Sequence, residues 1–373
     1  MSSAVYALSI HADYKCRHSG VCCAADWDVP VELPIYRSLV EAVQTGALDV
    51  APHAASLAPF IVEAGLPDDA AAMLERTAAG ACVFFETESR LCVVHRDLGE
   101  TALPATCRHF PRVAVRDGRG TSITLSHFCP TAASMLFREE MPLAVIESPR
   151  AFPAAEYEGL TVGRDELPPL LHPGMLMDLD GYSAWERHMI ARCNTSATPE
   201  WVLAALVRDA RQLRAWTPDA GPLADAVAGL PAAGVPVVPP ASFGRALELH
   251  AEIMAAVPDD LRPAPDEAML DAACRRFVAG RWDAFSVPLN RYLAAKAFAS
   301  WTAYQGRGVL SIVRGLEAAV ALVRIEASRL CRNHGRALDR DLLLEAFRAA
   351  DFVLNHLAVG EDLAAAWSTA EGR

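Results

Sequence analysis

The stretch "CRHSGVCC", residues 16–23, places three cysteines within eight positions, and two of them are adjacent. The chain has 373 residues and 10 cysteines, most of them before residue 130. The early ones are Cys16, Cys22, Cys23, Cys82, Cys92, Cys107 and Cys129. Free cysteine is often simply buried in a core, but this density favours a metal centre ligated by members of that set. Cys193, Cys274 and Cys331 stand alone in helical contexts, and we expect them to be core residues.

Composition and charge limit the class of protein. Hydrophobic residues make up 52% of the chain, the mean hydropathy is +0.17 and the formal net charge is −12. Such a chain has ample apolar material for packed domains, and its acidity excludes nucleic acid as the main partner. No secretory signal and no apolar run of membrane-spanning length is found. We therefore expect a cytoplasmic protein without a membrane span, in which thiols stay reduced.

Periodicity predicts a mainly α fold in two parts. We expect a cysteine-rich N-terminal metal-binding module with a short β-hairpin over 1–140, a Pro-rich connector over 141–175, and an α-helical domain over 176–373. Alternating apolar residues around a central Asp-Gly predict the hairpin at 112–126, which would bring Cys107 and Cys129 together. Most of the chain between Cys23 and Cys82, including residues 68–80, is predicted to be helical.

The C-terminal part carries the clearest helical patterns. Apolar residues recur at spacings of three and four over 309–330 and again over 340–357. Each pattern predicts one long amphipathic helix. The composition of 228–242 predicts a loop.

The cysteine spacing leaves the metal open. Zinc takes four ligands and a [4Fe–4S] cluster takes four thiolates, and the spacing matches neither paired Cys-x2-Cys motifs nor Cys-x3-Cys-x2-Cys. Cys22 and Cys23 would point in opposite directions in an extended segment, so they are not expected to share one metal atom. Four histidines near cysteines are further candidate ligands, although each is more often a hydrogen-bonding residue. These are His18, His95, His109 and His127.

Three stretches carry a resemblance to a known family. They are "YKCRHSGVCCAADWDVPV", "CVFFETESRLCVVHRDLGETALPATCRHFPR" and "SITLSHFCPTAASMLF". Together they resemble the flagellin lysine-N-methylase (FliB) family, which belongs with the YkgJ-type cysteine-cluster proteins described as zinc- or iron-chelating. The similarity covers most of the chain in order and length, with specific motifs in the first third. Ser19 stands where such proteins usually carry another cysteine.

The resemblance implies a [4Fe–4S] cluster and methyl transfer from S-adenosylmethionine to lysines of a protein such as flagellin. Trp27, Asp26, Asp28 and Tyr14 fit a sulfonium-binding surface loosely, although structural roles suit each of them better. No glycine-rich loop after a strand marks a nucleotide-cofactor site, so the catalytic and cofactor-binding residues stay unassigned. The alternative is a non-enzymatic zinc or Fe–S module that stabilises the fold, carries electrons or binds a partner. A third hypothesis is a metal-trafficking or storage protein.

Overall fold

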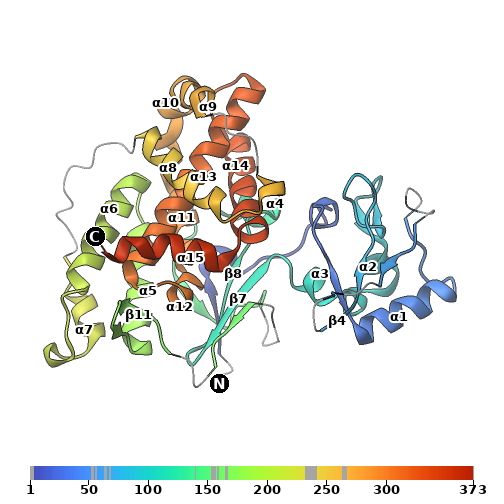
Figure 1. Ribbon diagram of the computed structural model, residues 1–373, viewed down its shortest axis with the longest axis horizontal. Coiled ribbons are helices and arrows are strands. Elements are labelled where there is room, and N and C mark those ends of the chain that lie inside the picture. The colour runs from blue at the N-terminus through green and yellow to red at the C-terminus, as the bar shows by residue number, and fades with distance from the viewer. Residues whose placement is uncertain are drawn as a thin grey trace. The chain divides into compact units, whose positions relative to one another are not determined.

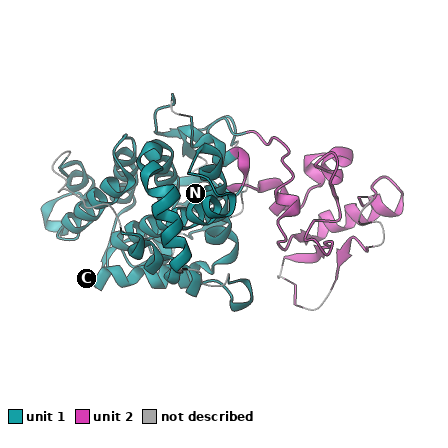
Figure 2. Cartoon of the chain, turned by 90° about the horizontal axis from the view of Figure 1, so that it is seen from above, with its two compact units in different colours: residues 1–14, 113–128, 132–373 teal, residues 15–112, 129–131 magenta. Residues whose placement is uncertain are grey.

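The computed structural model describes most of the chain. The residues outside the description are 1–3, 52–53, 55–56, 63–64, 67–68, 139, 153–156, 158, 164–166, 232–241, 263–266 and 373. The chain forms two compact units (Figure 2). Unit 1 comprises residues 1–14, 113–128 and 132–373, and unit 2 comprises residues 15–112 and 129–131.

Unit 1 contains a five-stranded sheet in the order β10-β7-β8-β1-β9 (Figure 1). Its strands are β1 (Val5–Leu8), β7 (Arg112–Asp117), β8 (Gly120–Leu125), β9 (Val145–Glu147) and β10 (Gly159–Thr161). The adjacent strands β7 and β8 confirm the predicted hairpin. β1 lies parallel to β8, with Val5 opposite Thr121, and antiparallel to β9.

Helices make up the rest of unit 1, together with the small hairpin β11 (Leu170–His172) and β12 (Met175–Leu176). The helices are α5 (Leu179–Cys193), α6 (Pro199–Leu213), α7 (Leu223–Ala228), α8 (Phe243–Ala255), α9 (Glu267–Ala273), α10 (Ala279–Trp282), α11 (Ser286–Ala297), α12 (Thr302–Gln305), α13 (Val309–His334), α14 (Arg340–Phe352) and α15 (Gly360–Ser368). Two π-helical turns, Cys274–Val278 and Val353–Leu357, extend α9 and α14.

Helix α13 is the centre of the helical part. It packs against α6, α8, α14 and α15, and most of its residues are buried. It ends where Gly335 adopts a left-handed conformation (φ 63°), which glycine tolerates without steric cost. Asp339 begins α14 by accepting a hydrogen bond from the backbone N–H of Leu342 (3.0 Å). Both long helices predicted from the apolar periodicity are confirmed.

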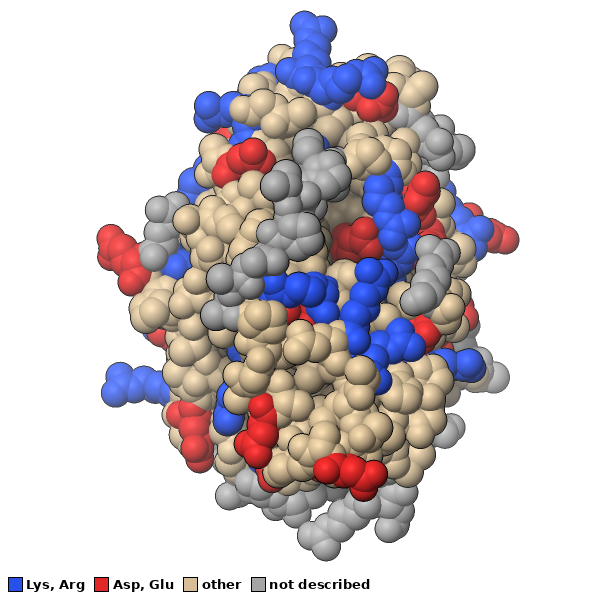
Figure 3. Space-filling model, turned by 90° about the vertical axis from the view of Figure 1, so that its left-hand side faces the viewer, with Lys and Arg blue, Asp and Glu red and all other residues tan. Residues whose placement is uncertain are grey.

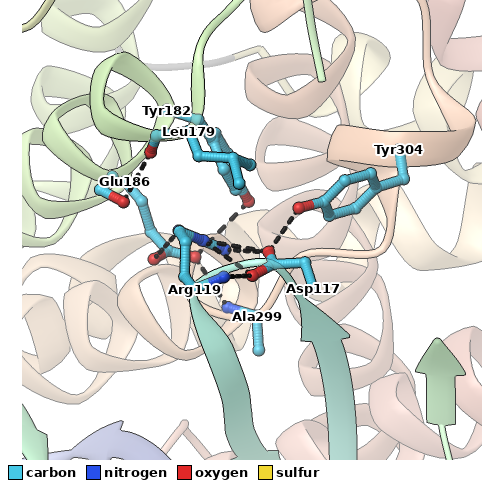
Figure 4. A network of polar contacts seen from close by, with 8 residues as sticks. Asp117, Arg119, Leu179, Tyr182, Glu186, Ala299 and Tyr304 are labelled. Atoms are coloured by element: carbon cyan, nitrogen blue, oxygen red, sulfur yellow. Dashed lines mark hydrogen bonds and ion pairs between the residues drawn. The ribbon is translucent and has the colours of Figure 1, made fainter. Parts of the chain in front are cut away.

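A buried ion-pair network joins the hairpin turn to the helices of unit 1 (Figure 4). The Arg119 guanidinium lies 2.8 Å from Asp117 Oδ2 and 3.1 Å from Glu186 Oε2, and its carbon is 4.3 Å from the centre of the Tyr182 ring. Tyr304 donates its hydroxyl hydrogen to Asp117. Both carboxylates are almost fully buried, and Arg119 is the cation that pairs with each of them. Burial raises the pKa of Glu186.

Unit 2 is built from short elements around a small core. Its elements are β2 (Pro30–Glu32), α1 (Leu33–Gln44), β3 (Phe60–Ile61), β4 (Ala70–Leu74), β5 (Phe85–Glu86), β6 (Leu91–Cys92), α2 (Val93–Leu98) and α3 (Ala105–His109). α4 (Pro130–Met135) begins in unit 2 and continues in unit 1. Strands β2, β4 and β3 form one antiparallel sheet, and β5 pairs with β6. The core includes Val31, Leu39 and Phe84, which are fully buried.

The fold differs from the expected mainly α class. Helices account for 55% and strands for 13% of the structure, so the protein is mixed α and β. The N-terminal part is not one cysteine-rich module, because β1 and the hairpin belong to the five-stranded sheet of unit 1. The division into units also differs from the boundaries expected at 140 and 175. The cause is the pairing of β1 with β8 across more than a hundred residues, which no local pattern encodes.

Two shorter segments also differ from expectation. Residues 70–74, expected to be helical, form β4, whose pairing with β2 and β3 overrides the helix propensity of its alanines. The expected connector contributes the strands β9, β10, β11 and β12. Most of the loop expected at 228–242 lies outside the described residues.

Candidate metal centre

Four of the seven early cysteines converge within unit 2. The Sγ atoms of Cys22 and Cys23 are 4.0 Å apart. The Cys23 thiol is also hydrogen-bonded to Cys92. Cys82 interacts electrostatically with Cys22 and Cys92. The four thiols come from three separate segments of the chain, which is the way in which metal sites commonly collect their ligands.

Backbone pairing brings these segments together. Residues Cys22–Ala24 form a short 3-10 helix, and the Cys23 carbonyl accepts a hydrogen bond from the Cys82 N–H (2.8 Å). The pairing of β5 with β6 then places Phe85 opposite Cys92. Because Cys22 and Cys23 lie in a helical turn, their side chains do not point in opposite directions as expected for an extended segment.

Two glycines permit this close approach. Gly20 has φ +72°, and a Cβ there would lie 2.5 Å from the Phe85 ring. Gly80 has φ +77°, and a Cβ there would lie 2.5 Å from the Asp26 side chain. Only glycine combines a left-handed backbone with the absence of a side chain. Both positions therefore allow the segments that carry the thiols to approach one another closely.

The four thiols have very different acidities. The hydrogen bond with Cys23 lowers the pKa of Cys22, and the hydrogen bond between Cys92 and Cys23, together with the backbone N–H groups of His95 and Val94, lowers the pKa of Cys92 to about 7. The same two contacts and burial raise the pKa of Cys23 strongly. Burial raises the pKa of Cys82 to about 12. Two of the four thus ionise readily, which suits metal binding because the thiolate is the ligating form.

The present side-chain arrangement falls short of a complete coordination shell. Within the described part of the chain, no three His, Cys, Asp or Glu side chains are arranged to hold one ion. The separation of Cys22 and Cys23 nevertheless approaches the edge of a zinc–thiolate tetrahedron, about 3.8 Å for Zn–S bonds of about 2.3 Å. The donor chemistry fits a thiolate-bound metal, and side-chain rotations would be needed to complete the shell.

The remaining three early cysteines also belong to unit 2. Cys16 is exposed, and its Sγ accepts a hydrogen bond from the His18 N–H (3.4 Å). Cys107 lies on α3 and packs against the unit 2 core, whereas Cys129 is buried at the start of α4. The chain passes from unit 2 into the hairpin of unit 1 after residue 112, and it re-enters unit 2 at Cys129. The expected proximity of Cys107 and Cys129 stays a prediction.

The candidate histidines divide between the units. His18 and His95 stack with their ring centres 5.1 Å apart in unit 2, next to cysteine-bearing segments. His109 is also in unit 2, where burial lowers its pKa. His127 is fully buried in unit 1, and its Nδ1 lies 3.1 Å from Asp351 Oδ2. His127 therefore belongs to a different polar network from the cysteines.

The aspartates beside the cysteine pair are engaged in ion pairs. Arg76 lies 3.4 Å from Asp26 and 2.5 Å from Asp28. Trp27 packs edge-on against Phe110 with the ring centres 5.0 Å apart. Neither aspartate is thus a free carboxylate beside the cysteines. Tyr14, the fourth residue considered for a sulfonium surface, is buried in unit 1.

The sequence did not predict a buried polar network that the structure shows in unit 1 around Asp351. Asp351 accepts hydrogen bonds from the His127 backbone N–H (2.6 Å) and the Tyr292 hydroxyl (2.7 Å), and lies 2.5 Å from Lys296 Nζ. Despite burial, the Lys296 and His127 partners hold the pKa of Asp351 far below its usual range. His127 Nε2 lies 3.4 Å from His11 Nε2. These residues are far apart in sequence, so no local motif could have revealed them.

The three isolated cysteines behave as core residues. Cys193, Cys274 and Cys331 are all buried in the hydrophobic cluster of unit 1. Burial raises the pKa of Cys193 and of Cys331, the latter to about 11.

Of the helices described, not one has the length and apolar character needed to cross a bilayer.

Comparison with known proteins adds no assignment. Protein-family models, curated proteins and solved structures give no match to this chain. The likeness to flagellin lysine-N-methylases therefore depends on the sequence motifs and their order along the chain, and no comparison tests it.

Proposed function

We propose that unit 2 is a thiolate-ligated metal module that holds a [4Fe–4S] cluster. The supporting observation is the convergence of Cys22, Cys23, Cys82 and Cys92 from three segments. The choice of cluster follows from the resemblance to the cysteine-cluster family. A cluster of this kind supplies redox chemistry or a structural tie, according to its potential and its exposure. We place this module in the cytoplasm, where reduced thiols are available to a metal.

Zinc is the second candidate, and one observation favours it. The 4.0 Å separation of the Cys22 and Cys23 Sγ atoms is close to the edge of a single-metal tetrahedron. Four thiolates around one zinc would give a closed structural site without redox activity.

Metal and acid-labile sulfide content after strictly anaerobic purification separates these candidates. About four iron and four sulfide per chain, with a brown absorbance that bleaches on reduction, would support the cluster. One zinc per chain in a colourless protein would support the second candidate. A chain that neither retains nor takes up iron or zinc would refute both.

Serine variants test the ligand set. We expect Cys92→Ser and Cys82→Ser to lose metal, because both remove thiols of the convergent group. Cys107→Ser and Cys129→Ser are expected to lower metal content too, from their place in the quoted motifs. Cys274→Ser is the matched control, since Cys274 is buried in the core of unit 1. Full metal retention in all four unit 2 variants would contradict the assignment.

The enzymatic part of the proposal is methyl transfer from S-adenosylmethionine to lysines of a protein such as flagellin. It rests on the resemblance. A lysine amine has an ordinary pKa of about 10.4 and must lose its proton before it attacks a methyl group. The metal-loaded chain would be incubated with methyl-labelled S-adenosylmethionine and flagellin, and label on lysine measured by mass spectrometry. Absence of label would refute the methyltransferase and leave the metal assignment intact.

A further inference from the structure

The loop that carries the first three cysteines, residues 16–23, is held against the hairpin of β5 and β6 by contacts that use no thiol. Arg90, in the turn of that hairpin, donates hydrogen bonds from Nε (3.0 Å) and Nη2 to the carbonyl oxygen of Ser19. Ser19 lies shortly before the adjacent cysteines, and Arg90 lies two residues before Cys92. The contact therefore joins two segments whose thiols are hydrogen-bonded to each other.

Arg90 has a backbone conformation that its residue type rarely adopts. Its φ is +58°, in the left-handed region, where a Cβ lies too close to the following carbonyl oxygen. A turn of this shape alone would favour glycine, which has no Cβ. The Arg90 side chain is also exposed, so the burial of apolar surface does not explain an arginine here. What the arginine adds is its two-donor contact with Ser19.

The guanidinium of Arg90 is directed to a backbone carbonyl and not to a carboxylate. Side chains of opposite charge lie next to one another at several places on the face drawn in Figure 3. Arg119 and Arg245, for example, each pair with a glutamate. Arg90 forms no ion pair with any described carboxylate. A guanidinium suits a two-donor contact, because its planar fork holds several N–H groups in fixed directions.

Two further contacts hold the same loop. The ring of His18 stacks on the ring of His95, with the ring centres 5.1 Å apart. Gly20 lies against the hairpin, because a Cβ there would be 2.5 Å from the Phe85 ring and 3.2 Å from the Arg90 carbonyl oxygen. Three successive loop residues thus each contact the hairpin or the helix α2 that follows it.

Such contacts affect a metal site because its ligands must be held at a fixed separation. The loop and the hairpin are far apart in sequence, so bringing their thiols together costs conformational entropy. Contacts that are present before the metal binds reduce the entropy that is lost at the binding step. Removing groups that orient metal ligands lowers metal affinity by about 10- to 100-fold.

We propose that Arg90 is a positioning residue of the thiolate site, which holds the loop of Cys22 and Cys23 beside Cys92 through the Ser19 carbonyl. This inference rests on the proposed metal site and extends it to a side chain that carries no ligand atom. Arg90 slows metal release, because a thiolate that leaves the metal stays close to it and rebinds. The effect applies to an iron–sulfur cluster and to zinc alike.

Timed release of the bound iron or zinc from the anaerobically purified chain to excess EDTA tests this role. Arg90→Gln removes the two-donor contact, whereas Arg90→Lys keeps one charged donor. Arg37→Gln on α1 is the matched control, since Arg37 is exposed and has no side-chain partner among the described residues. We expect release about ten-fold faster or more in Arg90→Gln, an intermediate rate in Arg90→Lys and the wild-type rate in Arg37→Gln.

Arg90→Gly separates positioning of the loop from stability of the fold. Glycine relieves the left-handed conformation, which offsets the lost hydrogen bonds, so the unfolding midpoint of the metal-free chain in urea should stay close to that of the wild type. Metal release should nevertheless be as fast as in Arg90→Gln. Wild-type release rates in both variants, or equal acceleration in Arg37→Gln, would overturn the role of Arg90. A wild-type chain that holds no metal would instead refute the metal site, and this inference with it.

Discussion

His250 provides a direct test of how burial affects the stability of unit 1. It lies on α8, and its Nε2 atom is buried without a hydrogen-bond partner among the described residues. Burial, and secondarily the positive charge of Arg329, lowers its pKa to about 4. Replacement by leucine removes the titrating group and keeps an apolar side chain of similar size in the helix.

The expected magnitude follows from proton linkage. Between pH 6.5 and pH 4 the unfolded chain binds a proton at this imidazole and the folded chain does not, so the stability falls as the pH falls. With an ordinary pKa of about 6.5 and a folded value of about 4, the loss between pH 8 and pH 5 is about 2 kcal/mol. His250→Leu should lack this loss. Relative to the wild type, the variant should therefore gain about 2 kcal/mol of stability on going from pH 8 to pH 5.

Urea unfolding followed by far-ultraviolet circular dichroism at pH 8, 6.5 and 5 measures this gain. Other buried histidines, such as His356, whose pKa is also lowered to about 4, contribute equally to both proteins and cancel in the comparison. The His334→Leu control removes an exposed imidazole at the end of α13 and should not gain stability on acidification. A constant difference between His250→Leu and the wild type at all three pH values would refute the reasoning.

Two further predictions concern Arg119 and the unit 2 thiols. Arg119→Met should lower the free energy of unfolding of unit 1 by about 3–5 kcal/mol in urea titrations, because it leaves Asp117 and Glu186 buried without their cation; a loss below 1 kcal/mol would contradict this role. In metal-free protein, Cys92 should react with iodoacetamide with an apparent pKa of about 7, and Cys82 only at much higher pH. Peptide mass spectrometry after timed alkylation measures both, and equal rates at pH 7.5 would refute the difference.

Local sequence patterns predicted the elements that local interactions determine. The 3.6-residue periodicity identified α13 and α14, although α13 is buried on most of its sides and not on one apolar face alone. The Asp117-Gly118 turn between two runs of alternating apolar residues identified the hairpin, because both signals are local. Strand pairing between segments far apart in the chain could not be predicted from local sequence patterns. β1 is a short strand whose partner β8 lies more than a hundred residues away, and the alanine-rich β4 is a strand only because β2 and β3 flank it.

The cysteines illustrate the same limit. Their density indicated a metal centre, but spacing alone could not rank the seven thiols. The structure distinguishes them, because the Cys22–Ala24 turn and the pairing of β5 with β6 bring four together. The prediction that the side chains of Cys22 and Cys23 point in opposite directions was wrong, because it assumed an extended backbone where the chain forms a 3-10 turn.

The small core of unit 2 connects its proposed metal with its stability. Among its described residues, the hydrophobic cluster contains twelve buried members and the strands are two to five residues long, so burial alone stabilises it weakly. Metal binding to thiolates adds its free energy to folding, because the unfolded chain does not hold a preformed site. Removing the metal should therefore increase hydrogen exchange across α1, α2 and β4, and leave α13 of unit 1 protected. Equal loss of protection in both units would show that the metal supports the whole chain, and no loss in either would refute the stabilising role of the metal.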